Sequence, residues 1–229
     1  MFTYYMPTQV FFGKGCIAES GQVLADLGKR ALLVTGRHSA KVNGSQDAFT
    51  GKLDELGISW YLFDDVENNP SIDTIRRAAA FAKEKGVDFV VGIGGGSPMD
   101  AAKAIALLCT DDLDDEQLFK GPYKKPLPIV AVPTTAGTGS EVTKVSVLTN
   151  VHAGTKQSIN TPLIFPVYAF ADPSFTESVS QTVTIDTAID ALSHAVEGYM
   201  SKLSTPMSDV WAEEAMRFIG DRKSTRLNS

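Results

Sequence analysis

The chain alternates between short, nearly continuous apolar runs and longer segments with apolar residues at helical spacing. Runs of the first kind are typical of strands buried in a parallel sheet, and segments of the second kind are typical of helices packed on its faces. The predicted strands are residues 31–35, 58–63, 87–93, 129–132, 144–150 and 167–171, and the predicted helices among them are residues 46–56, 72–85 and 98–108. This alternation predicts an α/β fold with a parallel sheet.

The pattern changes near Ser178. Residues 179–200 and 206–219 both show helical spacing, and no strand candidate lies between them. We therefore predict an α/β domain over residues 1–178, followed by a helical segment over residues 179–220.

Composition argues against several functional classes. With 229 residues, 43% of them hydrophobic, the chain can bury a substantial core. No run reaches the roughly 20 apolar residues of a membrane helix, and the start of the chain lacks the pattern of a secretory signal. A formal net charge of −6 argues against nucleic acid or an anionic membrane as a partner. Cys16 and Cys109 are the only cysteines and have no metal-binding or redox spacing, which fits a reducing cytoplasm.

The most informative segment is Val90–Lys103, in which a buried strand is predicted to turn through Gly94–Gly96 into a helix. Glycines leave no Cβ to block a phosphate that approaches the backbone, and the N-terminus of the helix attracts an anion. Ser97 lies where an N-cap is expected, Pro98 follows at the first helical position, and Asp100 completes a variant of the capping box. The segment predicts a phosphate site, although a tight connection without a ligand would look similar, and the ordinary dinucleotide fingerprint is not met.

Two further segments are candidates for the same site. Residues 133–143 crowd threonines and glycines at the end of a predicted strand, which fits either a second wall of a nucleotide cleft or a flexible polar loop. Asn69 and the two residues after it supply a turn and an N-cap at the end of another strand, where α/β folds place ligands. Lys156 is either an exposed charge or a phosphate contact.

Asp190 and His194 lie four residues apart on a predicted helix, so both side chains project from one face. A carboxylate and an imidazole placed in this way can bind one divalent ion, and Glu197 continues the same face. A helix with a hydrogen-bonded histidine and an exposed aspartate also explains the spacing, because such pairs are common by chance.

Three long motifs, taken together, closely resemble the iron-containing alcohol dehydrogenase family. They are GGGSPMDAAK at residues 94–103, PTTAGTGSEVT at residues 133–143 and DALSHAVEGY at residues 190–199. Their order and spacing also match, and the resemblance extends from about Met6 to about Ile219.

The resemblance implies a Rossmann-like, parallel-sheet nucleotide-binding domain followed by the start of an all-helical metal-binding domain. Asp190 and His194 match two metal ligands of the family, whose remaining ligands lie on later helices. The metal would be Fe²⁺, with Zn²⁺ as the alternative. The intact enzyme would transfer hydride between NAD(P) and a short-chain alcohol or aldehyde, and it could form a homodimer.

The resemblance also implies a set of cofactor contacts. Gly95, Gly96 and Ser97 would bind the pyrophosphate, and Asp100 would order the turn or meet the nicotinamide side. The other matching positions are Asn69, Thr134, Thr135, Thr138 and Lys156.

The resemblance implies that the residue directly after the strand 31–35, here Gly36, influences the choice between NAD and NADP. Family members that prefer NAD tend to carry a carboxylate there, which binds the ribose 2′-hydroxyl and repels a 2′-phosphate. Because Gly36 lacks one and Arg37, His38 and Ser39 follow, we expect NADP to be preferred over NAD.

Residues 221–229 break the helical pattern and no longer resemble the family, so we expect a non-native tail and a truncated, inactive fragment. Two alternatives remain open. The chain could be a glycerol dehydrogenase-like or dehydroquinate synthase-like member of the same superfamily, or a fragment that only binds nucleotide.

Overall fold

The computed structural model describes residues 1–151 and 154–226. Its contacts divide the chain into two compact units. The larger unit comprises Met6–Thr134 and Ser140–Ser178, and the smaller comprises Met1–Tyr5, Thr135–Gly139 and the chain from Val179 onward.

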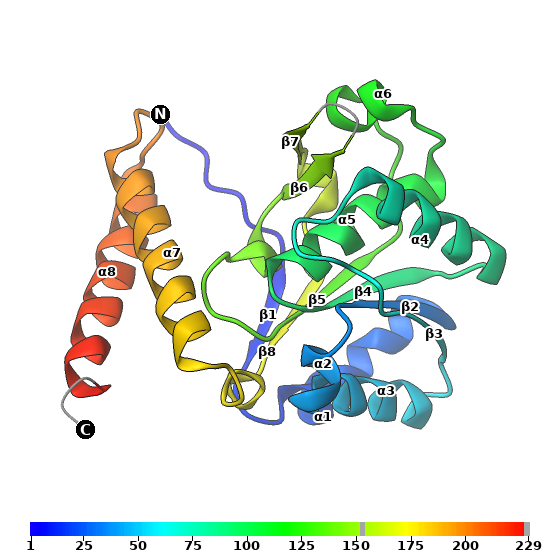
Figure 1. Cartoon of the computed structure of the whole chain (residues 1–229), viewed down its shortest axis with the longest axis horizontal. Helices are drawn as coiled ribbons and strands as arrows, with labels where there is room; N and C mark the ends of the chain where they lie inside the picture. The colour runs from blue at the N-terminus through cyan, green and yellow to red at the C-terminus, as the bar shows by residue number, and fades with distance from the viewer. Residues whose placement is uncertain (152–153, 227–229) are drawn as a thin grey trace. The chain divides into compact units, whose positions relative to one another are not determined.

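The larger unit is built on a six-stranded sheet with the order β1-β8-β5-β4-β2-β3, in which all neighbouring strands are parallel (Figure 1). These strands are β1 (Gln9–Phe12), β2 (Arg30–Thr35), β3 (Ser59–Phe63), β4 (Phe89–Gly94), β5 (Ile129–Pro133) and β8 (Tyr168–Ala171). The predicted α/β fold with a parallel sheet is therefore confirmed.

Helices cover both faces of this sheet. The helices of the unit are α1 (Cys16–Ser20), α2 (Ser39–Val42), α3 (Ser45–Glu55), α4 (Ile72–Lys85), α5 (Gly96–Thr110) and α6 (Asp115–Lys120), with short 3-10 helices η1 (Gly21–Asp26), η2 (Ser140–Val142), η3 (Pro162–Ile164) and η4 (Pro173–Thr176). Leu32 and Val34 of β2 pack in the cluster that holds α4 and α5, whereas Ala31 and Leu33 pack in the cluster that holds α1 and α3. Both faces of β2 are buried, which explains why its sequence is continuously apolar.

A separate antiparallel hairpin of β6 (Val145–Asn150) and β7 (Thr155–Asn160) follows η2. The sequence analysis predicted β6 but not β7, because β7 is exposed at every position except Ile159. It also missed β1, an edge strand with mostly exposed side chains, and α6, which begins after an Asp114 capping box and buries only Leu118. Exposed elements carry little apolar pattern, and that is the signal the sequence analysis used.

The smaller unit contains α7 (Gln181–Met200) and α8 (Pro206–Arg226). Ser180 caps α7 through its side chain, which accepts a hydrogen bond from the Val183 N–H. Helix α8 continues past Ile219, where the helical pattern was expected to end. The expected tail, residues 221–229, is thus helical as far as Arg226, and residues 227–229 lie outside the described part of the chain. Among the helices described, none combines the length and the apolarity that crossing a bilayer requires.

Candidate functional site

A glycine-rich turn joins the buried strand β4 to helix α5. Gly94 ends β4 with a φ of 148°, and a Cβ at this position would lie 2.7 Å from Pro98 Cγ, so the turn requires glycine. Helix α5 begins at Gly96, with Gly95 as its extended N-cap residue. The N–H groups of the first helical turn have no intrahelical acceptor, so those of Gly96 and Ser97 can donate to an anion.

The predicted capping box of Ser97 and Asp100 is wrong. Helix α5 has Gly95 as its N-cap, two residues before Ser97, and no side chain caps it. The Ser97 hydroxyl instead accepts a hydrogen bond from the Asn69 N–H, 3.1 Å away. Because neither side chain caps the helix, Ser97 and Asp100 can both bind distant segments.

Asn69 contacts the start of α5 and both strands of the β6–β7 hairpin. It has a positive φ of 55°, in the left-handed region that asparagine tolerates better than most residues. Lys156 Nζ donates to Asn69 Oδ1 at 2.8 Å, and Thr149 Oγ1 donates to the Asn69 carbonyl at 2.9 Å. The structure therefore brings together three of the predicted cofactor residues, Asn69, Ser97 and Lys156. Thr149 was not predicted, although it lies opposite Lys156 in the β6–β7 hairpin.

Asp100 lies on α5 and connects this helix to the hairpin. Its carboxylate accepts hydrogen bonds from Ser140 Oγ at 2.6 Å and from the Val147 N–H at 2.9 Å. Its carbonyl accepts a third from Ser146 Oγ at 2.8 Å. These contacts fasten α5 to the strand that carries Thr149. The expected role of Asp100 at the turn or at the nicotinamide side stays a prediction.

Lys103, one helical turn after Asp100, is fully buried with 0% of its side chain exposed. Its ammonium donates to Ser140 Oγ at 2.8 Å, Thr143 Oγ1 at 3.1 Å and the Val145 carbonyl at 2.7 Å, and it lies 3.8 Å from the Asp100 carboxylate. The sequence analysis missed this role. The available signal was a lone lysine in the otherwise apolar segment 101–108.

Burial dominates the electrostatics of this network. It lowers the pKa of Lys103 to about 8, while the nearby Asp100 and Glu141 carboxylates act in the opposite direction. Burial also raises the pKa of Asp100 above its usual range, opposed by Lys103 and by the hydrogen bond from Ser140. The pair is thus held by its hydrogen bonds against a substantial cost of desolvation.

Two other predicted residues lie at strand ends beside the glycine-rich turn. The Thr134 N–H donates to the Gly94 carbonyl at 2.8 Å, and the Thr134 side chain is only 2% exposed. Gly36 directly follows Thr35, which pairs with Ile93 of β4. Gly36 and the turn therefore share the carboxyl edge of the sheet, where α/β folds bind their ligands.

Thr135 and Thr138 belong to the smaller unit. Their loop approaches α7 closely, because a Cβ on Gly137 would lie 2.9 Å from the Thr187 carbonyl oxygen. Their predicted contact with the cofactor stays a prediction.

Asp190 and His194 lie on α7, and His194 Nε2 is 3.8 Å from Asp190 Oδ1. Both side chains are about half exposed, at 46% and 53%. Ser193 Oγ donates to Glu197 Oε1 at 3.0 Å, so the carboxylate of Glu197 has a partner of its own. Within the described part of the chain, no group of three or more histidine, cysteine, aspartate or glutamate residues is arranged to hold a metal.

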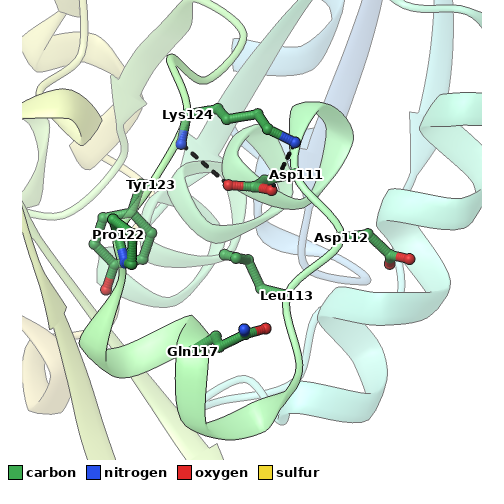
Figure 2. A pocket seen from close by; sticks show the side chains of 7 residues that line it. All are labelled: Asp111, Asp112, Leu113, Gln117, Pro122, Tyr123 and Lys124. Carbon is green, nitrogen blue, oxygen red and sulfur yellow. Dashed lines mark hydrogen bonds and ion pairs between the residues drawn. The ribbon is translucent and has the colours of Figure 1, made fainter.

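A surface hollow of about 330 Å³ lies elsewhere, between the end of α5 and the segment after α6 (Figure 2). Across it, Lys124 donates to Asp111 through its N–H at 3.0 Å and contacts the same carboxylate through Nζ at 3.2 Å. The hollow is lined by Asp111, Asp112, Leu113, Gln117, Pro122, Tyr123 and Lys124. None of the predicted site residues is among them.

Two family models match the chain. The model described as iron-containing alcohol dehydrogenase matches residues 7–173, and the C-terminal model of the same family matches residues 184–228. Together they cover the glycine-rich turn, the hairpin and the helix that carries Asp190 and His194.

Individual relatives agree with these matches. The crystal structure of an iron-containing alcohol dehydrogenase from Thermotoga maritima is 51% identical, with a TM-score of 0.91 over 96% of this chain and 61% of that one. NADH-dependent butanol dehydrogenase A from Clostridium acetobutylicum is 37% identical over 87% of this chain and 52% of its own length. NADPH-dependent butanol dehydrogenase from Clostridium saccharobutylicum is 32% identical over 96% of this chain and 58% of its own length.

The chain thus spans 52–61% of the length of these relatives. A family model matches well over half of it, and the fold agrees with a solved member of the same family over nearly its whole length. The chain therefore belongs to the iron-containing alcohol dehydrogenase family.

Proposed function

We propose that this chain binds a nicotinamide dinucleotide at the carboxyl edge of its parallel sheet. In a full-length member of this family, the bound cofactor would exchange hydride with a short-chain alcohol or aldehyde. The observation that carries the proposal is the convergence of Asn69, Ser97 and Lys156 beside the glycine-rich turn.

Each part of this convergence has a role in binding an anionic cofactor. The N–H groups of Gly96 and Ser97 would donate to the pyrophosphate at the positive end of the helix dipole. Lys156 would supply a positive charge that Asn69 holds in position. Asp100 and Lys103 would act indirectly, because they fasten the hairpin to α5.

We further propose that Asp190 and His194 are metal ligands. A carboxylate and an imidazole on one helical face are donors that Fe²⁺ and Zn²⁺ both accept, and the two donor atoms lie 3.8 Å apart on side chains that are about half exposed. A metal held by these two residues would supply Lewis-acid chemistry to the oxygen of a bound aldehyde or alcohol. Two donors alone bind a metal weakly, so we expect the 229-residue chain to bind the nucleotide without catalysing turnover.

For the cofactor, we propose that NADP is preferred over NAD. The support is the absence of a carboxylate at Gly36, directly after β2, and the presence of Arg37 one residue later. The relatives include both an NADH-dependent and an NADPH-dependent butanol dehydrogenase, so family membership alone does not decide the preference.

Titration of the chain with NADPH, followed by nucleotide fluorescence or calorimetry, tests the proposal. Asn69→Ala removes the acceptor that holds Lys156, and we expect roughly tenfold weaker binding, equivalent to about 1.4 kcal/mol. Lys124→Met is the matched control, because it removes a lysine from the unrelated hollow in Figure 2. Equal affinity for the wild type and Asn69→Ala, or no binding by a folded wild type, would refute the proposed site.

A further inference from the structure

A cluster of charged side chains surrounds the carboxyl ends of β2 and β3. Its cationic members are Arg37 after β2, Lys41 in α2 and Arg77 in α4. Its anionic members, Asp64, Asp65 and Glu67, all follow β3. Three positive and three negative charges offset one another, so the cluster as a whole is neutral.

Asp65 is the centre of this cluster. Its Oδ1 accepts hydrogen bonds from Arg37 Nε at 3.0 Å and Arg37 Nη2 at 2.5 Å, and its Oδ2 accepts one from Arg77 Nη2 at 3.2 Å. The hydrogen bond from Arg37, followed by the one from Arg77, holds the pKa of Asp65 below its usual range. Lys41 has a different partner, since its Nζ donates to Asp64 Oδ2 at 2.7 Å. The guanidinium groups of Arg37 and Arg77 therefore both donate hydrogen bonds to the carboxylate of Asp65.

The register of the sheet places this cluster beside the phosphate-binding turn. Thr35 pairs with Ile93 of β4, and Val34 pairs with Phe63 of β3. Arg37 and Asp65 thus stand at neighbouring strand ends, with the glycine-rich turn on the other side of β2. In dinucleotide-binding α/β folds, the strand next to the phosphate-binding turn ends at the adenosine ribose, where NAD and NADP differ.

We propose that Asp65 is a residue that determines cofactor specificity, and that it limits the preference for NADP. This inference rests on the proposed function, which places the dinucleotide at this edge. A 2′-phosphate is bound best by guanidinium groups that donate two hydrogen bonds to it, and both nearby guanidinium groups already donate to Asp65. Removal of this carboxylate charge leaves Arg37 and Arg77 able to bind a 2′-phosphate, whereas the 2′-hydroxyl of NAD gains nothing from them.

Arg37 can respond to such a change. Its side chain is 72% exposed and Asp65 is 39% exposed, so packing restrains the guanidinium only weakly. Arg77 also lies over the ring of Phe63, with 5.9 Å between its guanidinium carbon and the ring centroid. Arg37 is therefore the arginine expected to move toward a 2′-phosphate, while Arg77 contributes its charge from a more constrained position.

The test compares the dissociation constants of NADPH and NADH for the wild type and for Asp65→Asn. We expect NADPH to bind about three- to tenfold more tightly to Asp65→Asn, NADH to be unchanged within about twofold, and the gain to shrink at high salt. Adding Arg37→Gln to this variant should remove the gain. Arg37→Gln alone should weaken NADPH binding more than NADH binding.

Asp115→Asn is the matched control. Asp115 also pairs with an arginine, through Arg76 Nη2 at 2.6 Å, and the substitution changes the net charge equally, but this pair links α4 to α6. We expect its ratio of NADPH to NADH affinity to equal that of the wild type. The inference is overturned if Asp65→Asn leaves the ratio of NADPH to NADH affinity unchanged. It is also overturned if Asp115→Asn changes this ratio by the same factor as Asp65→Asn. A wild type that binds neither cofactor would instead refute the proposed function, and the inference with it.

Discussion

Replacement of the buried Lys103 by methionine is expected to destabilise the α/β unit substantially. The side chain is 0% exposed, and its ammonium bonds Ser140, Thr143 and the Val145 carbonyl. Methionine fills a similar volume but donates no hydrogen bond. Lys103→Met therefore leaves these acceptors without their donor and leaves the Asp100 carboxylate without its nearby cation.

The magnitude follows from two opposing effects. Removing one member of a buried ion pair typically costs about 3–5 kcal/mol, because the remaining charge stays buried. Asp100 keeps its hydrogen bonds from Ser140 and Val147, and methionine needs no desolvation, so part of this cost is offset. We expect the free energy of unfolding to fall by about 2–4 kcal/mol.

Urea denaturation can measure this loss locally. The chain has two tryptophans, Trp60 in β3 and Trp211 in α8, so a Trp211→Phe background leaves Trp60 as a probe of the α/β unit. Lys52→Met is the matched control. The Lys52 side chain is also buried, at 8% exposed, but its ammonium pairs with Glu55, which is 66% exposed, so we expect a loss within about 1 kcal/mol.

The pH dependence gives a second readout. Because the pKa of Lys103 is about 8 in the folded chain and 10.5 is its ordinary value, the unfolded chain binds more protons between these two values. The free energy of unfolding of the wild type should therefore rise relative to that of Lys103→Met as the pH increases from 8 to 10. Asp100 and Glu141 are the carboxylates that act on this lysine, and both are ionised throughout this range in the unfolded chain. A loss below about 0.5 kcal/mol at pH 7, together with parallel pH curves for the two proteins, would refute the reasoning.

Two further predictions concern the strand–helix contact and the metal ligands. A Cβ on Gly92 would lie 2.8 Å from Met99 Cα, so Gly92→Ala should cost about 1–3 kcal/mol in urea denaturation, whereas Gly51→Ala, where no neighbour lies within 4 Å, should be neutral or stabilising by up to about 1 kcal/mol. Equal stability of the two variants would contradict the close approach of β4 and α5. His194→Ala should weaken Zn²⁺ binding at least about tenfold by calorimetry, as expected for loss of one of two donors, while Asp186→Ala on the same helix should leave it unchanged. Identical zinc affinities for these two variants would argue against His194 as a ligand.

Much of the fold could be read from local pattern. The helix predicted at residues 72–85 matches α4 at both ends, because Ser71 caps its start and Gly86 in the left-handed conformation ends it. Strands β2, β4 and β5 were predicted within two residues, since burial on both faces makes each of them a continuous apolar run. The family resemblance was likewise contained in the three motifs and was confirmed.

The candidate site was only partly predictable. Asn69, Ser97 and Lys156 were each selected as cofactor residues, but nothing local indicated that they contact one another. The motif suggested that Asp100 pairs with Ser97, whereas its partners are Ser140 and Val147. Lys103 drew no attention, because a lysine within a helix is ordinarily solvated, and Thr149 drew none because β7 was not predicted.

The sequence by itself determined the buried local elements, the glycine-rich turn and the family, since each of these is carried by short segments with a distinctive local pattern. Only the tertiary structure decided which polar groups meet, because the order β4-β2-β3 and the β6–β7 hairpin bring together residues 28 to 87 positions apart. A hydrogen-bonding side chain is compatible with many partners, and its choice among them depends on the burial and register that the assembled sheet imposes.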